Sequence, residues 1–355
     1  MSARYQAAAG SAVAGSRVLV AMSGGVDSSV AAALLRESGH DVTGVTLKLW
    51  GGDSDSGCCS VSDVEDARRV AAQLDIPHYV FNFTDEFDAA VVDPYVAAYA
   101  NGSTPNPCVE CNRVIKFGRL FERADALGFD YLATGHHARV ALSVHGDYRL
   151  LRGADAAKDQ SYVLYMLGQR ELARTLLPVG ELTKAEVRAH ASRLGLRTAD
   201  KAESMDVCFI TRGGREQFLA SRTPARAGAI VDTSGSTVGE HRGVAGFTVG
   251  QRRGLGVATG ERRYVVGVDA RAATVTIGTR ADLLRDRVEL RDLTFVQDRP
   301  AIEALVAQVR AHGEPVEVTL DRTTVRFARP ELRVAPGQVV ALYDGDALVG
   351  GGIAT

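Results

Sequence analysis

The feature that most constrains the fold is the segment Ser23-Gly-Gly-Val-Asp-Ser-Ser29, close to the N-terminus. The apolar run Arg17–Ala21 before it predicts a short buried strand, and the Ala- and Leu-rich run Val30–Leu35 after it predicts a helix. Two adjacent glycines let the backbone bring N–H groups close to an anion, and the helix N-terminus adds favourable dipole charge. The serines supply hydroxyl donors, and Asp27 can orient the loop or help hold Mg²⁺. We therefore expect a phosphate site here rather than an ordinary Gly-rich turn.

The segments that follow alternate between strand and helix patterns. Apolar runs of strand length recur at Val42–Leu49, Tyr79–Phe83 and Tyr131–Ala133. A capping-box pattern, Thr183-Lys-Ala-Glu186, starts a helix that should end near Leu194. Further helices are expected at Asp63–Leu74, Glu86–Tyr99 and Arg113–Leu127. Strands and helices alternating at this spacing predict an α/β fold with a doubly wound parallel sheet.

The pattern changes after about residue 212. The segments Tyr264–Val268 and Thr274–Ile277 are typical of two strands joined by a turn. Short strands continue from Arg287 onward, and Asp344-Gly345 predicts a tight hairpin turn. We expect a small β-rich central domain and a C-terminal β-barrel. The predicted division is a disordered tail at 1–16, a catalytic domain at 17–212, the central domain at 213–283 and the barrel domain at 284–355.

Composition limits the classes of function. A formal net charge of −2 argues against a protein that coats nucleic acid nonspecifically, although a specific RNA enzyme can carry a local basic surface. No apolar run approaches the ~20 residues that a bilayer requires. The N-terminus lacks the basic start and apolar middle of a secretory signal. We expect a cytoplasmic protein without membrane contact.

The five cysteines, at positions 58, 59, 108, 111 and 208, indicate no disulfide scaffold, because their number is odd and the chain is large. Two prolines stiffen the segment Thr104-Pro-Asn-Pro-Cys-Val-Glu-Cys-Asn112 ahead of a predicted helix. Cys111 is expected at or next to the start of that helix, where the dipole and the neighbouring Arg113 and Lys116 favour the thiolate. Cys208, taken alone, is more typical of a buried structural cysteine than of a reactive one.

Two metal sites compete with thiol chemistry. A structural zinc site would combine Cys58 and Cys59 with Cys108 and Cys111, but adjacent cysteines are an unusual ligand pair. An iron–sulfur cluster would use Cys108, Cys111 and Cys208, with one iron left open. We expect no resident metal on these cysteines, and the cluster stays open as the alternative.

The Ser23–Ser29 loop differs from the Gly-x-x-x-x-Gly-Lys phosphate loop, which occurs nowhere in this sequence. This difference argues against transfer of the γ-phosphate. Ser-Gly-Gly-x-Asp-Ser after a strand resembles the loop of the ATP-pyrophosphatases, whose fold is adenine nucleotide alpha hydrolase-like and which cleave ATP between the α- and β-phosphates. Amidating enzymes of that group need no cysteine pair, and many carry a glutaminase module that is not recognisable here. A noncatalytic RNA-binding module would need no such loop.

Taken together, the motifs resemble the tRNA-specific 2-thiouridylase family of the bacterial type. They run in order from Val18 almost to the C-terminus and are Met22-Ser-Gly-Gly-Val-Asp-Ser-Ser29, Thr104-Pro-Asn-Pro107 with Cys111-Asn112, Ala133-Thr-Gly-His136, Lys158-Asp-Gln-Ser-Tyr162, Val207-Cys-Phe-Ile210, Gly250-Gln-Arg-Arg-Gly-Leu-Gly256, and Pro336-Gly-Gln338 with Gly350-Gly-Gly352. The resemblance implies a sulfur-transferring enzyme that uses ATP and Mg²⁺ to adenylylate O2 of the wobble uridine (position 34) of tRNA. A protein persulfide then displaces AMP and leaves 2-thiouridine.

The resemblance also implies roles by position. Cys208 matches the cysteine that carries the persulfide, and Cys111 matches its partner, with a Cys111–Cys208 disulfide as one way to resolve the pair. ATP contacts are implied for Ala21, Met22, Ser23, Gly24, Gly25, Val26, Asp27, Ser28, Leu47 and Gly135. Contacts with the target base are implied for Asn106, Pro107 and Cys108, and contacts with the rest of the tRNA for His136, Lys158, Asp159, Gln160, Arg310 and Gln338.

Three positions depart from common patterns of the family. Cys108 stands where many members have Asp, Leu47 stands where Met is frequent, and Ala311 follows Arg310 where an aromatic residue is frequent. The first departure puts an acid–base role at position 108 in doubt. The implied partners are tRNAs with anticodons of the Lys, Glu and Gln type, and a cysteine desulfurase or sulfur-carrier protein as sulfur donor.

Overall fold

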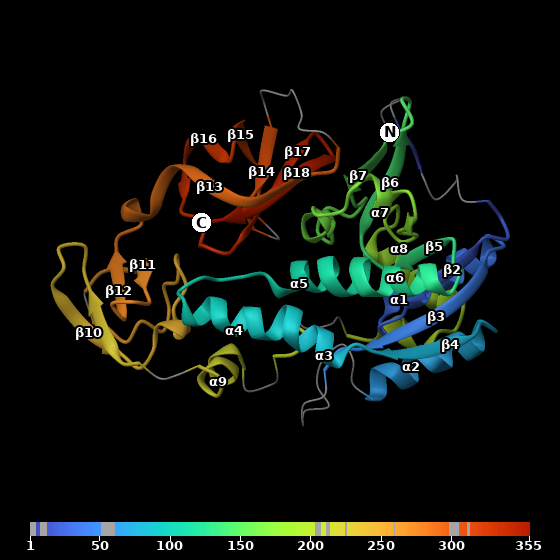
Figure 1. The fold of residues 1–355 in the computed structure, drawn as a ribbon, viewed down its shortest axis with the longest axis horizontal. Coiled ribbons are helices and arrows are strands. Elements are labelled where there is room, and N and C mark those ends of the chain that lie inside the picture. Colours follow the sequence, from blue (N-terminus) through green and yellow to red (C-terminus); the bar gives the residue numbers. More distant parts are fainter. Residues whose placement is uncertain are drawn as a thin grey trace.

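The computed structural model describes residues 5–7, 13–50, 61–202, 207–210, 214–223, 226–258, 260–297, 305–310 and 313–355. Three parts lie along the long axis of the molecule: a parallel sheet with its helices at one end, a small β domain at the other, and the C-terminal barrel beside the helices between them (Figure 1). Cys58 and Cys59 lie outside the described residues, and so does the zinc site that would have included them.

The first part is built on a five-stranded parallel sheet in the order β4-β3-β2-β5-β8. Successive residues of a strand point to opposite faces. On β2, Leu19 packs into one buried apolar cluster, whereas Val18 and Val20 pack into another. Both faces are therefore covered, which confirms the doubly wound parallel sheet. The strands are β2 (Arg17–Ala21), β3 (Asp41–Lys48), β4 (His78–Asn82), β5 (Tyr131–Thr134) and β8 (Thr175–Leu176).

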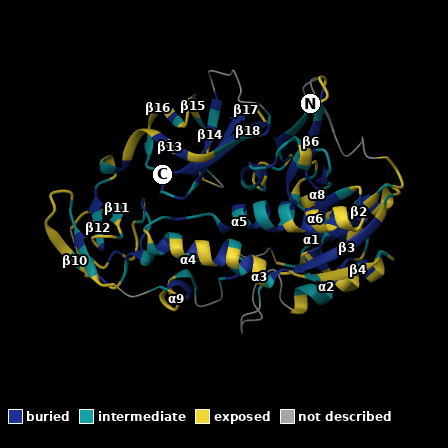
Figure 2. Ribbon diagram, viewed as in Figure 1, coloured by how far each residue is buried: buried dark blue, intermediate teal, exposed yellow. Residues whose placement is uncertain are grey.

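Helices cover this sheet, and their outer sides are exposed while the central strands are buried (Figure 2). Helix α2, which the sequence predicts at Asp63–Leu74, buries Ala67, Val70 and Ala71. The helices are α1 (Val26–Glu37), α2 (Val61–Gln73), α3 (Thr84–Phe87), α4 (Asp93–Ala100), α5 (Pro107–Glu110), α6 (Leu120–Ala126), α7 (Gln169–Leu172) and α8 (Lys184–Arg193). Two π-helical stretches join α3 to α4 and α5 to α6, at Asp88–Val92 and Cys111–Arg119.

A hairpin that the sequence did not predict follows β5. Strands β6 (Ala138–Ser143) and β7 (Tyr148–Arg152) pair antiparallel, and β7 pairs in turn with β18 of the barrel. Strand β1 (Tyr5–Ala7) pairs with β6, so part of the segment expected as a disordered tail is a strand instead. The catalytic part and the barrel thereby share one nine-stranded sheet.

Six of those strands close into the C-terminal barrel, which confirms the predicted β-barrel. They follow the order β18-β13-β16-β15-β14-β17, and β17 pairs back with β18. Alternating residues such as Val288, Val325 and Val340 fill the barrel core. The strands are β13 (Leu284–Phe295), β14 (Leu305–Gln308), β15 (Val316–Asp321), β16 (Thr324–Leu332), β17 (Val339–Asp344) and β18 (Ala347–Ala354).

The central part is a four-stranded sheet in the order β10-β9-β12-β11, preceded by helix α9 (Gly214–Ala220). Ile230, Val265 and Val275 form the centre of its own small core. This separate core supports the expected β-rich domain. The strands are β9 (Gly228–Val231), β10 (Thr237–His241), β11 (Tyr264–Asp269) and β12 (Thr274–Gly278).

All three parts meet at Thr104, just before the first cysteine of the Cys108–Cys111 pair. Its N–H donates to the carbonyl of Pro336 at 2.6 Å, and its carbonyl accepts from Nε2 of Gln338 at 2.5 Å. Its hydroxyl lies 3.3 Å from that of Thr248 in the central part. Gly337 has φ of +90°, and a Cβ there would lie 3.1 Å from the nitrogen of Pro105. The barrel therefore holds the start of the cysteine segment in place.

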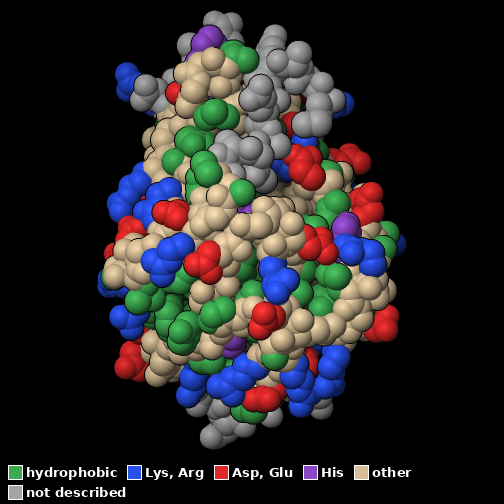
Figure 3. Space-filling model, turned by 90° about the vertical axis from the view of Figure 1, so that its right-hand side faces the viewer, with side chains coloured by type: hydrophobic (Ala, Val, Ile, Leu, Met, Phe, Trp, Pro, Cys, Tyr) green, Lys and Arg blue, Asp and Glu red, His purple; other side chains and the backbone are tan. Residues whose placement is uncertain are grey.

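The surface at the sheet end of the molecule carries basic, acidic and apolar side chains in mixture (Figure 3). Among the described side chains seen on that face, neither sign of charge forms a continuous area, so it does not offer an extended basic surface for RNA. No helix in the described part of the chain combines the length and the apolar character that crossing a membrane requires.

Candidate active site

The turn between β2 and α1 is shaped as an anion cradle. Gly24 has φ of +75°, and a Cβ at this position would lie 2.3 Å from the carbonyl oxygen of Asp63, so only glycine fits. Gly25 is the N-cap of α1, and it has no side chain that could cap the helix. The first turn of this 12-residue helix therefore offers its backbone dipole to a ligand.

The serines of the loop hold the turn closed. Oγ of Ser28 accepts from the N–H of Ser23 and donates to the carbonyl of Gly25, each at 3.2 Å. Oγ of Ser29 donates to the same carbonyl at 2.8 Å. The sequence suggested these hydroxyls as donors to the anion, but those of Ser28 and Ser29 are committed to the loop backbone. Backbone N–H groups are thus the donors that we expect a phosphate to meet.

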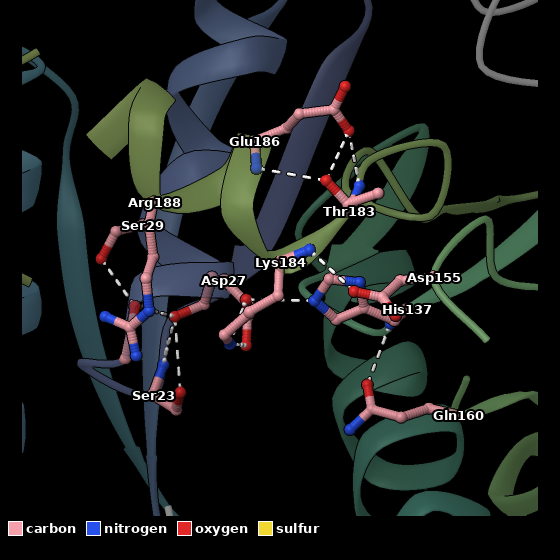
Figure 4. A network of polar contacts seen from close by, with 12 residues as sticks. Ser23, Asp27, Ser29, His137, Asp155, Gln160, Thr183, Lys184, Glu186 and Arg188 are labelled. Atoms are coloured by element: carbon pink, nitrogen blue, oxygen red, sulfur yellow. Dashed lines mark hydrogen bonds and ion pairs between the residues drawn. The ribbon is translucent and has the colours of Figure 1, made fainter. Parts of the chain in front are cut away.

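Asp27 is the hub of a polar network beside this turn (Figure 4). Both of its carboxylate oxygens accept from Nζ of Lys184 at 2.7 Å, and Oδ1 lies 3.2 Å from Nε2 of His137. Burial works to raise the pKa of Asp27, but the hydrogen bonds from His137 and Lys184 and the charge of Lys184 outweigh it and lower the pKa below its ordinary value. The carboxylate therefore stays ionised at neutral pH.

A second lysine braces the other side of the turn. Nζ of Lys201 donates to the carbonyl of Gly24 at 3.0 Å and to the carboxylates of Asp63 and Asp66 at 2.7 Å each. Burial lowers the pKa of Lys201, and these two carboxylates raise it by more, so the cation is stabilised. Arg188 of α8 holds the Lys201 backbone by donating to its carbonyl at 3.2 Å.

The remaining residues with implied ATP contacts gather at the same edge of the sheet. A Cβ at Gly135 would lie 2.6 Å from the nitrogen of Ser28, so the segment after β5 packs directly on the start of α1. Leu47 is buried near the end of β3, and the N–H of Met22 donates to Val45 of that strand at 2.8 Å. This is the carboxyl edge, where open α/β sheets bind their ligands. The structure brings together Ala21, Met22, Ser23, Gly24, Gly25, Val26, Asp27, Ser28, Leu47 and Gly135 there.

The helix that contains Cys108 and Cys111 begins earlier than the sequence predicts. The helix begins at Pro107, not near Arg113, and Oδ1 of Asn106 caps it by accepting from the N–H of Cys108 at 3.1 Å. Cys108 thus lies in the first turn, whereas Cys111 is buried one turn further along. The expectation that Cys111 stands at the helix N-terminus is wrong, and the dipole acts on Cys108 instead.

Cys208 is placed by the aromatic residue that follows it. Phe209 is fully buried, and its ring centre lies 5.2 Å from that of Tyr95, 5.3 Å from that of Phe218 and 5.8 Å from that of Phe87. The half-buried Cys208 packs against the same apolar cluster that contains Cys111.

Tyr95 belongs to this same apolar cluster. Its ring contacts that of Phe209, and burial and the neighbouring Tyr99 raise the pKa of its phenol. The apolar cluster thus holds Cys111 and the segment of Cys208 together. The Cys111–Cys208 disulfide stays a prediction.

Within the described part of the chain, no three His, Cys, Asp or Glu side chains are arranged to hold a metal ion. The iron–sulfur cluster on Cys108, Cys111 and Cys208 stays open as the alternative.

The residues with implied tRNA contacts fall into two groups. Asp159 and His136 are buried: Asp159 accepts four hydrogen bonds from within the chain, and Nδ1 of His136 lies 2.7 Å from the hydroxyl of Thr134. Burial, followed by the charge of Lys116, lowers the pKa of His136 well below its ordinary value, so this ring is neutral. Both side chains are therefore held by contacts within the protein in this structure.

The other group lies nearer the surface. Gln160 is exposed, and its Oε1 accepts from the N–H of His137 at 2.9 Å, so the Lys158–Gln160 segment adjoins the Asp27 network. Arg310 and Gln338 line a cavity of about 350 Å³ between the central part and the barrel. In the sequence, both residues are far from the phosphate loop. Gln338 also anchors Thr104, as described above.

Comparison with known proteins places this architecture in one family. Family models described as tRNA methyl transferase HUP domain, tRNA methyl transferase PRC-barrel domain and Aminomethyltransferase beta-barrel domain match residues 16–212, 216–279 and 285–354. The chain is 48% identical to the tRNA-specific 2-thiouridylase MnmA of Roseiflexus castenholzii, over 95% of this chain and 98% of that one. It is 47% identical to the MnmA of Moorella thermoacetica, over 94% and 98%. The chain belongs to the tRNA-specific 2-thiouridylase family.

Membership in the 2-thiouridylase family confirms the resemblance seen in the motifs. Among solved structures, the chain is similar to the U34-tRNA thiolase NcsA from Methanococcus maripaludis with its 4Fe-4S cluster. That match has 18% identity, covers 59% of this chain and 64% of that one, and has a TM-score of 0.38, so it carries no argument about function.

Three charged or titratable residues of this 2-thiouridylase-family site escaped the sequence analysis: His137, Lys184 and Lys201. Lys184 is separated from Asp27 by 157 positions, and Lys201 from Gly24 by 177, so no local pattern connects them. The one available signal was the capping box at Thr183, which indicates that a helix starts beside Lys184 but not where the side chain points.

Proposed function

We propose that this chain is a tRNA-uridine 2-sulfurtransferase. It adenylylates O2 of the wobble uridine of tRNA at the expense of ATP and then transfers sulfur from a protein persulfide, giving 2-thiouridine, AMP and pyrophosphate. The observation that carries the proposal is the presence, in one domain, of the anion cradle at Gly24–Gly25 and of two thiols, Cys111 and Cys208, on one apolar cluster. Family membership supports the same reaction.

The phosphate turn can stabilise the charge that develops in the activation step. Uracil O2 is a poor leaving group until it carries AMP, and charge builds on the α-phosphate as O2 bonds to it. Backbone N–H groups at the start of α1 stabilise such charge without reorganisation. The ionised Asp27 is the residue that we expect to hold Mg²⁺, which neutralises charge on the phosphates of a bound nucleotide.

Cys208 and Cys111 can together carry out the transfer of sulfur. The terminal sulfur of a Cys208 persulfide attacks C2 of the activated uracil, and AMP leaves with the electron pair of the C2–O2 bond. A Cys111 thiolate then attacks Sγ of Cys208, the bond between Sγ and the transferred sulfur breaks, and that sulfur stays on C2. The product is a Cys111–Cys208 disulfide, which an external thiol must reduce before the next cycle.

Cys108 has a secondary role in this proposal. A residue in the first turn of the helix, capped by Asn106, suits contact with the target base, and Asp at this position in other members of the family cannot carry sulfur. The competing cluster mechanism needs Cys108 as an iron ligand. Cys108→Asp separates the two: reduced but clear thiolation supports a secondary role, whereas joint loss of brown colour and activity in anaerobically purified protein supports the cluster.

The substrates and partners follow from the same chemistry. A wobble uridine is unpaired in the free anticodon loop, so extruding it costs little. We propose that Asn106–Cys108 face this base, that Lys158, Gln160, Arg310 and Gln338 contact the tRNA, and that the tRNAs have anticodons of the Lys, Glu and Gln type. The sulfur donor is a cysteine desulfurase or a sulfur carrier, and the enzyme works in the cytoplasm.

The test is reconstitution with unmodified tRNA, Mg·ATP, cysteine and a cysteine desulfurase. We expect 2-thiouridine in the digested tRNA and tRNA-dependent release of pyrophosphate. Asp27→Asn should lose pyrophosphate release while its tRNA affinity stays within a few-fold. Cys208→Ser should keep pyrophosphate release, lose thiolation, and lack the mass of one added sulfur atom on its peptide. Full thiolation by Cys208→Ser, or pyrophosphate release that ignores tRNA, would refute the proposal.

A further inference from the structure

The phosphate turn of this chain has no lysine of its own, because its sequence is Ser23-Gly-Gly-Val-Asp-Ser-Ser29. Turns that cradle the phosphates of a nucleoside triphosphate commonly use a lysine as a point charge. We propose that Lys184 supplies that charge: it binds the β- and γ-phosphates of ATP, and then the departing pyrophosphate, by exchanging its contact with Asp27 for phosphate oxygens. This inference rests on the proposed function and deepens it.

The fold holds Lys184 in a defined position at the turn. It is the first residue of α8, and the capping box between Thr183 and Glu186 fixes the first turn of that helix. Its backbone N–H donates to Oδ2 of Asp155 at 2.9 Å, and this bond is the main cause that lowers the pKa of Asp155. The side chain extends from this anchored backbone to Asp27, as Figure 4 shows.

The charges at the turn favour the exchange. The side chain of Lys184 is 14% exposed and that of Asp27 is 30% exposed, so the pair lies at the edge of the cradle and not deep inside the protein. Without a cation beside it, the Asp27 carboxylate would repel any phosphate that entered the cradle. A triphosphate competes well for Lys184 because it carries more negative charge than one carboxylate, and a metal ion arriving with the nucleotide compensates Asp27.

Lys201 is the other lysine that could bind the phosphates, but its contacts indicate a structural role in the turn. Its ammonium group donates to three oxygens, those of Gly24, Asp63 and Asp66. One of these is the backbone carbonyl of the turn, and two carboxylates already balance the charge. Removing Lys201 should therefore distort the turn as a whole. It serves as the matched control for Lys184, since both are lysines that contact the same loop.

Lys184 donates no proton in the reaction step that it assists. The bond from uracil O2 to the α-phosphorus forms, and the bond from that phosphorus to the bridging oxygen breaks. The electron pair leaves on pyrophosphate, and the N3 proton of the uracil passes to solvent. Lys184 stabilises the charge that gathers on the leaving pyrophosphate and stays protonated throughout.

The test compares Lys184→Met, Lys184→Arg and Lys201→Met by direct calorimetric binding of AMP and of pyrophosphate, each with and without Mg²⁺. Lys184→Met should weaken pyrophosphate binding by at least about tenfold, the size expected for one charge-assisted hydrogen bond, while AMP binding stays within about twofold. Lys184→Arg should restore part of the loss. Lys201→Met should weaken both ligands together. In the turnover assay, Lys184→Met should lower kcat for pyrophosphate release far more than it raises KM for tRNA.

Asp27→Asn gives a second readout that does not depend on turnover or on the folding of the lysine variants. Because this change frees Lys184 from its carboxylate, pyrophosphate without Mg²⁺ should bind more tightly than to the wild type. Weaker binding there, or equal losses of AMP and pyrophosphate affinity in Lys184→Met, would overturn the inference. A wild-type protein that binds pyrophosphate through Lys184 but never thiolates tRNA would instead refute the proposed function alone.

Discussion

Replacing Asp159 with alanine tests whether this carboxylate belongs to the fold or to tRNA binding. Its side chain is 5% exposed and accepts from Nη1 of Arg152 at 2.8 Å. It also accepts from the N–H groups of Gly153 and Ser161 and from the Ser161 hydroxyl, at 3.0 Å each. Arg152 continues the network into the barrel, where it donates to Gln308 at 2.6 Å and lies 3.7 Å from the centre of the Tyr343 ring.

The size of the effect follows from these contacts. Removing one partner of a buried ion pair costs about 3–5 kcal/mol, because the other charge stays buried and uncompensated. Arg152 keeps Gln308 and the Tyr343 ring, and its side chain is 19% exposed, so we expect about 3 kcal/mol, near the low end of that range. Asp159→Asn keeps the shape and an acceptor oxygen and should cost less.

The assay is thermal and urea unfolding beside tRNA binding, with Lys158→Ala as the neighbouring control. Asp159→Ala should lower the melting temperature by on the order of 5–10 °C, whereas Lys158→Ala should leave it unchanged and weaken tRNA binding. If Asp159→Ala leaves stability within about 1 kcal/mol of the wild type and loses tRNA affinity instead, Asp159 is an RNA contact and the reasoning fails.

Three further perturbations have defined outcomes. Gly135→Ala should abolish ATP binding, measured by calorimetry, because its Cβ would meet the backbone nitrogen of Ser28 at 2.6 Å. Because His136 is held neutral, the unfolded chain binds one proton more as pH falls through about 6.5, so stability should fall on acidification by up to ~1.4 kcal/mol per pH unit, and less in His136→Gln. Phe209→Leu should keep pyrophosphate release and persulfide loading on Cys208 but slow thiolation, since the ring anchors that cysteine; equal loss of all three would mean that Phe209 only stabilises the fold.

Much of the fold could be predicted because apolar runs are local. The strand Arg17–Ala21 was predicted with the bounds that the structure gives, and β4 differs from its prediction by one residue at each end. The hairpin β6–β7 was missed although Gly146, with φ of +86°, marks its turn, because its strands mix apolar residues with arginines and are short.

The site was predictable where a motif is contiguous and not where it depends on tertiary contacts. The Ser23–Ser29 loop could be assigned because sequence neighbours form it. The predicted helix start near Arg113 is wrong because Pro107 is compatible both with a rigid loop and with a helix start: Asn-Pro is also a signal for an N-cap followed by the first helical residue. The partners of Asp27 could not be found, since only the packing of α8 against α1 brings Lys184 beside it.

The shared nine-stranded sheet has a consequence for how the protein is made. Strand β18 completes the barrel and also pairs with the edge of β7 in the catalytic part. Regions nearer the N-terminus are synthesised first, so the edge of β7 stays unpaired until β18 has been made. An unpaired edge is a template for association with other chains. Loss of β18 would therefore open the barrel and expose the edge of β7 at the same time, so one strand protects two parts of the molecule from aggregation.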